Sequence, residues 1–150
     1  MMKKLKLIAG LLLAGFTTQA QSKQEDYYKF TRVPLPEKVV LEAGGIAMLP
    51  NGNLAVSTRR GDIYTVSNPL GKADDMKVKL FARGLHEPLG LHWSDGWLYA
   101  TQRCEVTRIK DEDGDGRADV FETLTDGWGI NGDYHEYAFG SQFDPEGNMW

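Results

Sequence analysis

The chain has 150 residues, of which 41% are hydrophobic and 25% are charged, and its formal net charge is −4 at pH 7. This acidic balance argues against nucleic acid and anionic membrane surfaces as partners, because both repel a negative protein. The single cysteine, Cys104, excludes an intramolecular disulfide and a C-x-x-C-H haem attachment within these residues, and we expect it to be a small buried residue near a strand end.

Residues 1–20 have the features of an export signal. The segment begins with three positive charges, from Lys3, Lys4 and Lys6. An apolar stretch follows over residues 7–16, too short to span a bilayer, and a small-x-small site ends at Ala20. We therefore expect an exported chain, periplasmic or secreted, with no membrane span after cleavage. The alternative is a retained single-pass anchor.

Residues 21–37 are polar and then proline-bearing, which predicts an extended lead-in. From residue 38 to residue 150, short apolar or alternating runs are separated by Gly, Asn, Asp and Pro. That pattern predicts an all-β domain, because helical periodicity is hard to find in it.

Three segments share one layout of glycine, strand, polar-glycine turn and strand: residues 45–56, 90–100 and 140–150. Further strands are expected over residues 63–66, 78–81, 106–109 and 120–123. The three copies begin 45 and 50 residues apart, and this spacing suits the four-stranded blades of a propeller. We predict an incomplete β-propeller with two blades and the start of a third, and therefore a fragment of a longer protein, since closure needs about four blades. A β-sandwich is the alternative, but it does not explain the repeat.

Equivalent loops of the first two copies both carry an arginine. Arg59 follows the second strand of the first copy, and Arg103 follows the second strand of the second copy. In a propeller such loops lie at one end of the central channel, so the two guanidinium groups would attract carboxylates or phosphates there. The alternative is a pair of solvated loop arginines.

Residues 111–122 match the calcium-loop pattern D-x-D-x-D-G-x5-E at each of its positions. The expected ligands are Asp111, Asp113, Asp115, the carbonyl of Arg117, Asp119 and Glu122. Strands rather than helices are expected before the loop, so an EF-hand is disfavoured. We predict a structural calcium loop between the third and fourth strands of the second copy. The alternative is a solvated acidic turn.

His135 lies just before the third copy, where the chain enters an innermost strand and faces the channel. A neutral imidazole is a competent general base near physiological pH, so His135 is the candidate catalytic residue. The alternative is a hydrogen-bonded structural histidine. His86 and His92 are weaker candidates by position.

The chain resembles the soluble PQQ-dependent glucose/sorbosone dehydrogenase propellers. The resemblance rests on residues 84–91 (GLHEPLGL), the turns at 51–52 and 95–96, residues 58–61, and His135 ahead of residues 143–147. It is closer to exported bacterial propeller proteins described as membrane-bound dehydrogenases, often fused to a c-type haem domain. The segments shared with that group are residues 59–61, 84–90, 111–119 and 134–137, and the similarity covers about residues 27–150.

The resemblance implies that His135 abstracts the alcohol proton while PQQ accepts a hydride. It also implies that basic residues, mostly from later blades, hold the cofactor's carboxylates, and Arg59 and Arg103 would line the channel mouth. The first hypothesis is therefore an exported oxidoreductase of the PQQ sugar or alcohol dehydrogenase type. Its electrons would pass to a haem domain or to a separate acceptor such as a c-type cytochrome.

Two other classes of function are compatible with the sequence. One is a non-catalytic, calcium-stabilised propeller that binds polysaccharide or protein, with four aromatic residues as its contact surface: Trp93, Trp97, Trp128 and Tyr137. Those aromatics would otherwise pack between blades. The other is hydrolysis or elimination at a sugar uronate, which has only the arginines in its favour.

Overall fold

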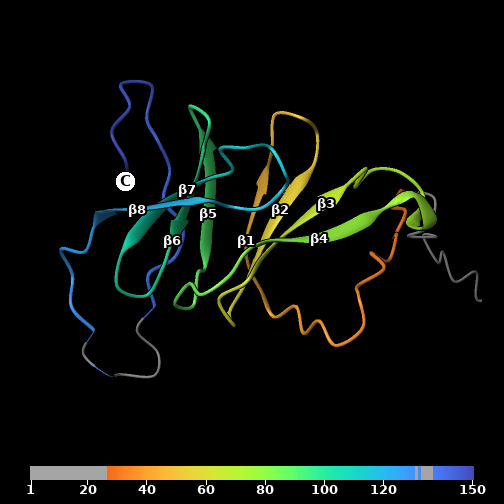
Figure 1. Ribbon diagram of the computed structural model, residues 1–150, viewed down its shortest axis with the longest axis horizontal. Coiled ribbons are helices and arrows are strands. Elements are labelled where there is room, and N and C mark those ends of the chain that lie inside the picture. The colour runs from red at the N-terminus through yellow and green to blue at the C-terminus, as the bar shows by residue number, and fades with distance from the viewer. Residues whose placement is uncertain (1–26, 131, 133–136) are drawn as a thin grey trace, which may run out of the picture. The chain divides into compact units, whose positions relative to one another are not determined.

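The computed structural model describes residues 27–130, 132 and 137–150 (Figure 1). The chain divides into two compact units, Met1–Phe30 and Thr31–Trp150. Only residues 27–30 of the first unit are described, and every strand belongs to the second. Within the described part of the chain, no helix is long and apolar enough to cross a membrane.

The second unit contains two four-stranded antiparallel sheets, each with its strands in chain order. The first sheet consists of β1 (Ala43–Met48), β2 (Leu54–Thr58), β3 (Ile63–Ser67) and β4 (Lys77–Ala82). The second consists of β5 (Gly90–Ser94), β6 (Trp97–Thr101), β7 (Val106–Lys110) and β8 (Val120–Thr125). One short 3-10 helix, η2 (Ala73–Asp75), precedes β4. The prediction of an all-β domain is thus confirmed for the described residues.

The two sheets repeat one another in detail. In both β2 and β6, one half-buried residue is followed by four buried ones, and β3 and β7 also share a single burial pattern. The ladder to the outer strand shifts register at the same place in each sheet. The shift lies between Ile63 and Tyr64 in the first sheet and between Val106 and Thr107 in the second. The internal repeat read from the glycines therefore corresponds to a repeat of whole sheets.

The sheets meet through their first strands, where β1 lies against β5. The contact is made by glycine. A Cβ atom on Gly45 would stand 2.5 Å from the backbone nitrogen of Leu91, and one on Gly90 would stand 2.4 Å from the Cα of Gly140. Gly45 and Gly90, which open the first two copies, thus approach the next copy with their backbones. That closeness explains why these two copies begin with a residue that has no side chain.

The core lies between the two sheets. It consists of Ala47, Ala55, Ile63, Ala82, Leu91, Leu98, Ala100 and Ile109. Alanine on the facing strands lets the sheets pack closely, and Ile109 and Ile63 are fully buried. On β1, Gly45 and Ala47 are buried while Ile46 and Met48 are 61% and 56% exposed. One face of the first sheet is therefore covered by the second, and its other face carries exposed apolar side chains.

The third copy forms a hairpin with a single ladder bridge, between Phe143 and Met149. Gln142 and Trp150 exchange two backbone hydrogen bonds across it, of 3.0 and 2.9 Å. The expected turn is present, but among the described residues 137–150 the two expected strands are reduced to this one bridge. In Figure 1 its turn lies on the same side as the turns between β1 and β2 and between β5 and β6.

Candidate functional site

The two arginines singled out by the repeat are joined by one carboxylate, that of Glu87. Arg59 donates from Nε to Glu87 Oε1 over 3.2 Å, and Arg103 donates from Nη1 to Glu87 Oε2 over 2.9 Å. Arg103 and Glu87 are mostly buried, with side chains 15% and 18% exposed, while Arg59 is 41% exposed. The structure therefore brings Arg59 and Arg103 together around one carboxylate, while their place at the mouth of a channel stays a prediction.

Tyr137 completes this group, which we call the arginine cluster (Arg59, Glu87, Arg103 and Tyr137). Its hydroxyl accepts from Arg59 Nη2 over 3.4 Å. Its ring centre lies 5.2 Å from the guanidinium carbon of Arg103 and 5.9 Å from that of Arg59. Both cations therefore lie within the range of cation–π attraction to one ring.

Backbone hydrogen bonds hold both arginines to the segment just before the opening glycine of a copy. The amide of Arg59 donates to the carbonyl of Glu42, three residues before Gly45, and the amide of Arg103 donates to the carbonyl of His86, four residues before Gly90, both over 3.0 Å. Arg59 directly follows β2 and Arg103 lies two residues after β6. Both arginines reach Glu87, which lies in the segment between the two sheets. Trp128 supports the second one, since its Nε1 donates to the Arg103 carbonyl over 2.9 Å.

The electrostatic balance of the arginine cluster favours anions. Its two guanidinium groups and one carboxylate leave one net positive charge. The hydrogen bond from Arg103 holds the pKa of Glu87 below its ordinary value; burial opposes this shift, and the hydrogen bond from Arg59 adds to it. Glu87 therefore stays ionised at neutral pH, and an incoming carboxylate or phosphate would compete with it for the arginines.

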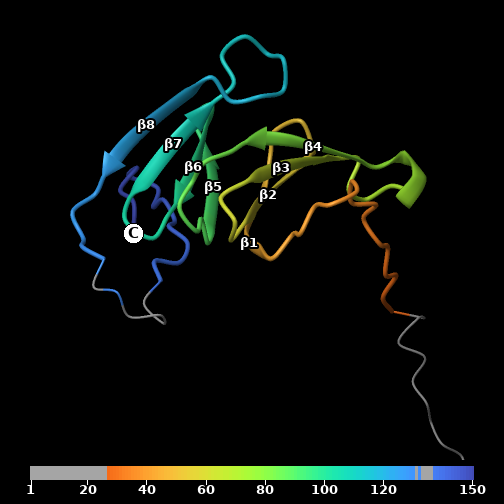
Figure 2. The same ribbon diagram turned by 60° about the horizontal axis from the view of Figure 1, so that its bottom comes forward.

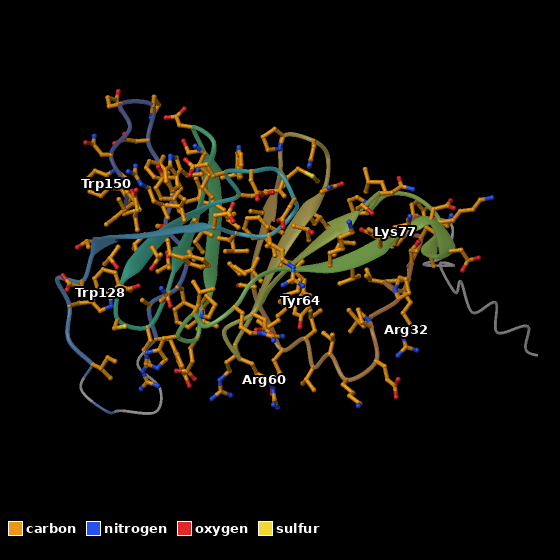
Figure 3. All side chains as sticks on the ribbon, in the orientation of Figure 1. Arg32, Arg60, Tyr64, Lys77, Trp128 and Trp150 are labelled. Carbon is orange, nitrogen blue, oxygen red and sulfur yellow. The ribbon has the colours of Figure 1, made fainter. Side chains whose placement is uncertain are left out.

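The sequence analysis did not place Glu87 or Tyr137 beside the two arginines, although a signal for both positions was present. Glu42, Glu87 and Tyr137 each stand three residues before the glycine that opens a copy. Glu42 occupies the matching place in the first copy, where it accepts from Arg60 Nε over 3.0 Å. In Figure 3, Arg60 lies at the end of the first sheet opposite the turn between β1 and β2. Extending the repeat three residues upstream would have located all three positions.

The candidate base, His135, lies outside the described residues, as do residues 133, 134 and 136. Its role stays a prediction. Cys104, expected to be buried, is instead half-buried, and its Sγ lies 3.8 Å from Nδ1 of His86.

The acidic loop, residues 111–119, connects β7 to β8, as predicted. Figure 2 shows it, in cyan, extending beyond the ends of these strands. Carboxylate oxygens of Asp111, Asp113 and Asp115 lie within 4.8 Å of one another. Asp111 accepts from the amides of Gly114 and Gly116 over 2.8 and 2.9 Å. Three of the six predicted ligands therefore face one point.

The other three predicted ligands have different positions. Asp119 Oδ2 accepts from the amides of Glu112 and Asp113, over 2.9 and 3.4 Å, and so ties the loop to itself. The amide of Arg117 donates to Asp115 Oδ1 over 2.7 Å.

Glu122 is not brought to the aspartates. It lies on β8 directly opposite Arg108 and accepts from Arg108 Nε over 2.7 Å. The reason is that the loop is followed by a strand. In an EF-hand the last ligand of the loop lies where a helix begins, whereas β8 begins here at Val120 and carries Glu122 into the ladder. The spacing of the motif is kept, but the exit geometry differs.

The aromatic residues proposed as a contact surface mostly have partners within the chain. Trp93 packs against the core between the sheets. The ring of Trp97 lies under Arg108 and Lys110, at 4.3 Å from the guanidinium carbon and 5.4 Å from Nζ. With Trp128 and Tyr137 in the contacts given above, these four residues do not form one free aromatic surface.

Comparison with known proteins provides no family assignment: no protein-family model matches the chain, and no curated protein has significant sequence similarity to it.

Proposed function

We propose that this chain is part of an exported β-propeller oxidoreductase of the PQQ-dependent sugar or alcohol dehydrogenase type. The observation that carries the proposal is the arginine cluster, because Arg59 and Arg103 come from equivalent points of two sheets and share one neighbourhood. The repeated four-stranded sheets, whose first strands lie side by side, are the arrangement that successive propeller blades would have.

The arginine cluster is compatible with one carboxylate of a polycarboxylate cofactor. Arg59 and Arg103 would bind it, and Glu87 would hold the two guanidinium groups in position until it is displaced. PQQ would supply hydride acceptance. With one net positive charge here, the remaining carboxylates would need basic residues outside the cluster.

His135 is the proposed general base for the substrate hydroxyl, and Tyr137 follows it by two residues in the chain. An imidazole that is neutral near pH 7 can take the hydroxyl proton as the hydride departs. Electrons would leave to a haem domain or to a c-type cytochrome acceptor.

The test is to incubate the protein with PQQ and calcium and to measure PQQ binding and dye reduction with sugars and alcohols. His135→Asn should abolish dye reduction while PQQ still binds. Arg103→Ala should weaken PQQ binding by about tenfold or more, as expected for losing a charged hydrogen-bond donor. Arg83→Ala is the matched control, because that exposed arginine pairs with Asp62 instead. An absence of both PQQ binding and dye reduction would overturn the proposal.

Calcium in the acidic loop is a second part of the proposal. Three carboxylates within 4.8 Å repel one another unless a cation neutralises them, and calcium prefers such hard oxygen ligands. Asp111, Asp113 and Asp115 would be the main ligands, with the Arg117 carbonyl and Asp119 completing the site. Because Glu122 is paired with Arg108, the affinity should be below that of a loop with a bidentate glutamate.

The alternative is a non-catalytic, calcium-stabilised propeller that binds polysaccharide or protein. The exposed Phe139 and Trp150, 67% and 81% accessible, are the observation in its favour. Pull-down on insoluble polysaccharides, with a Trp150→Ala variant, separates this function from dye reduction.

A further inference from the structure

A cavity of about 250 Å³ lies between the two sheets, beneath the acidic loop. Its lining comes from both sheets and from the loop: Leu49, Asn51, Asn53, Thr65, Phe81, Trp93, Gly96, Leu98, Asp111 and Gly116. The lining includes the hairpin residues just before β2 and β6, whereas the arginine cluster follows the other ends of those strands. The cavity is therefore separate from the site proposed for redox chemistry.

The lining of the cavity is partly apolar and partly polar. Its larger apolar residues are Leu49, Phe81, Trp93 and Leu98, two of them aromatic. Its polar residues are Asn51, Asn53, Thr65 and Asp111. Small-molecule sites combine apolar walls with a few convergent polar groups in this way.

The chemistry of the polar lining residues points to a neutral, hydroxyl-rich ligand. Each asparagine amide offers donors and an acceptor, and the threonine hydroxyl offers both, which matches hydroxyl groups that also donate and accept. Among the described residues, the lining contains no lysine, arginine or histidine, so an anion would meet the carboxylate of Asp111 and no cationic side chain there. A sugar ring also has an apolar C–H face, which an aromatic wall can cover.

The cavity is held in shape by backbone contacts. The amide of Ala118 donates to the carbonyl of Phe81 over 2.9 Å, which fastens the acidic loop of the second sheet onto β4 of the first. The amide of Asn53 donates to Asn51 Oδ1 over 3.1 Å, which fixes the hairpin that carries both amides. A site formed before its ligand arrives loses less entropy on binding.

We propose that this cavity is a binding site for a single neutral sugar unit, free or at the end of a glycan. Its volume is below the roughly 300–1,000 Å³ of sites for drug-sized ligands, which suits one ring. The site does not depend on the redox proposal, since none of its lining residues belongs to the arginine cluster, but it shares Asp111 with the proposed calcium loop.

The test follows the indole N–H signal of Trp93 by NMR, assigned with a Trp93→Phe variant, during titration with glucose, galactose and xylose. At least one sugar should shift the signal in a saturable way. Asn53→Ala should weaken that binding about tenfold, as for the loss of one or two hydrogen bonds. Asn148→Ala is the matched control, because Asn148 holds the same place in the third copy but bonds Asp144 on an exposed hairpin. It should bind sugar like the wild type.

Three results would overturn the proposal: no shift with any of the three sugars, equal weakening in both asparagine variants, or binding of tetramethylammonium but not of sugar. The last would mark the cavity as a cation site instead. Thr65→Val is a second variant in case Asn53→Ala does not fold. Arg103→Ala should leave the Trp93 response unchanged, so failure of dye reduction and failure of this site can be told apart.

Discussion

The two sheets have the same skeleton but differ in the segment between their third and fourth strands. In the first sheet this segment contains η2 with Asp74 and Asp75 in a row. In the second it is the acidic loop, whose aspartates alternate and whose Ala118 is bonded to the first sheet. The strands and the register shift between the third and fourth of them are repeated, while the connections between those two strands are not. The strands therefore give the two sheets the same architecture, and the segments between the third and fourth strands give each sheet its own chemical groups.

The largest expected effect tests the common architecture. Gly90→Val should destabilise the fold by about 3 kcal/mol or more, because its Cβ would lie 2.4 Å from the Cα of Gly140 and backbone must move to admit it. Urea unfolding followed by circular dichroism measures the change. Gly127→Val, where an added Cβ meets only Thr125 Oγ1 at 3.5 Å, is the control and should cost far less. Equal effects of the two would contradict the glycine contact.

The next largest effect distinguishes the acidic loop of the second sheet from the corresponding segment of the first sheet, which contains η2. If calcium binds the acidic loop, calcium at about 100 times its Kd should stabilise the protein by about 2.7 kcal/mol and raise the Tm. Replacing Asp111 and Asp115 together by alanine should remove that rise. Replacing Asp74 and Asp75 in the first sheet should leave it intact. A Tm that does not respond to EDTA in the calcium-treated wild type would count against the site.

A smaller effect distinguishes Glu87 from Glu42, its counterpart in the first sheet. Glu87→Gln should cost about 1 kcal/mol at pH 7, since the pair with Arg103 is partly buried, and Glu42→Gln about 0.5 kcal/mol or less, since its pair with Arg60 is exposed. The pKa of Glu87 is lowered in the folded state. Its contribution is therefore complete above the unfolded-state pKa and is lost as the pH falls through the folded-state pKa.

Urea midpoints measured between pH 7 and pH 2 should converge for the wild type and Glu87→Gln at the acid end. A difference that stays constant over the whole range would show that ionisation of Glu87 does not contribute.

Strand positions were predictable from the sequence because they depend on local alternation and on turn residues. The strands expected over residues 63–66 and 106–109 are observed as β3 (Ile63–Ser67) and β7 (Val106–Lys110), each one residue longer. The meeting of Arg59 with Arg103 followed from the repeat alone. These features are local, or are copied from one unit to the next.

Contacts between side chains of different repeat copies were harder to predict from the sequence. Glu87 binds an arginine 28 residues earlier and another 16 residues later, and neither distance is encoded in a local pattern. For Glu122, a local pattern was present but predicted the wrong partner. Its spacing fits a calcium loop, but the ladder register of β8 decides its partner, and register depends on the neighbouring strand.

The glycines at positions 45, 90 and 140 have a consequence for how such a molecule can change over time. Where neighbouring units touch main chain to main chain, the thickness of the polypeptide itself sets their separation. Turns and connections can then lengthen or acquire new chemistry without disturbing the stacking, provided that Gly45 and Gly90 gain no side chain. When such a unit is duplicated, its opening glycine is duplicated with it, and that glycine is what allows close contact with the next unit.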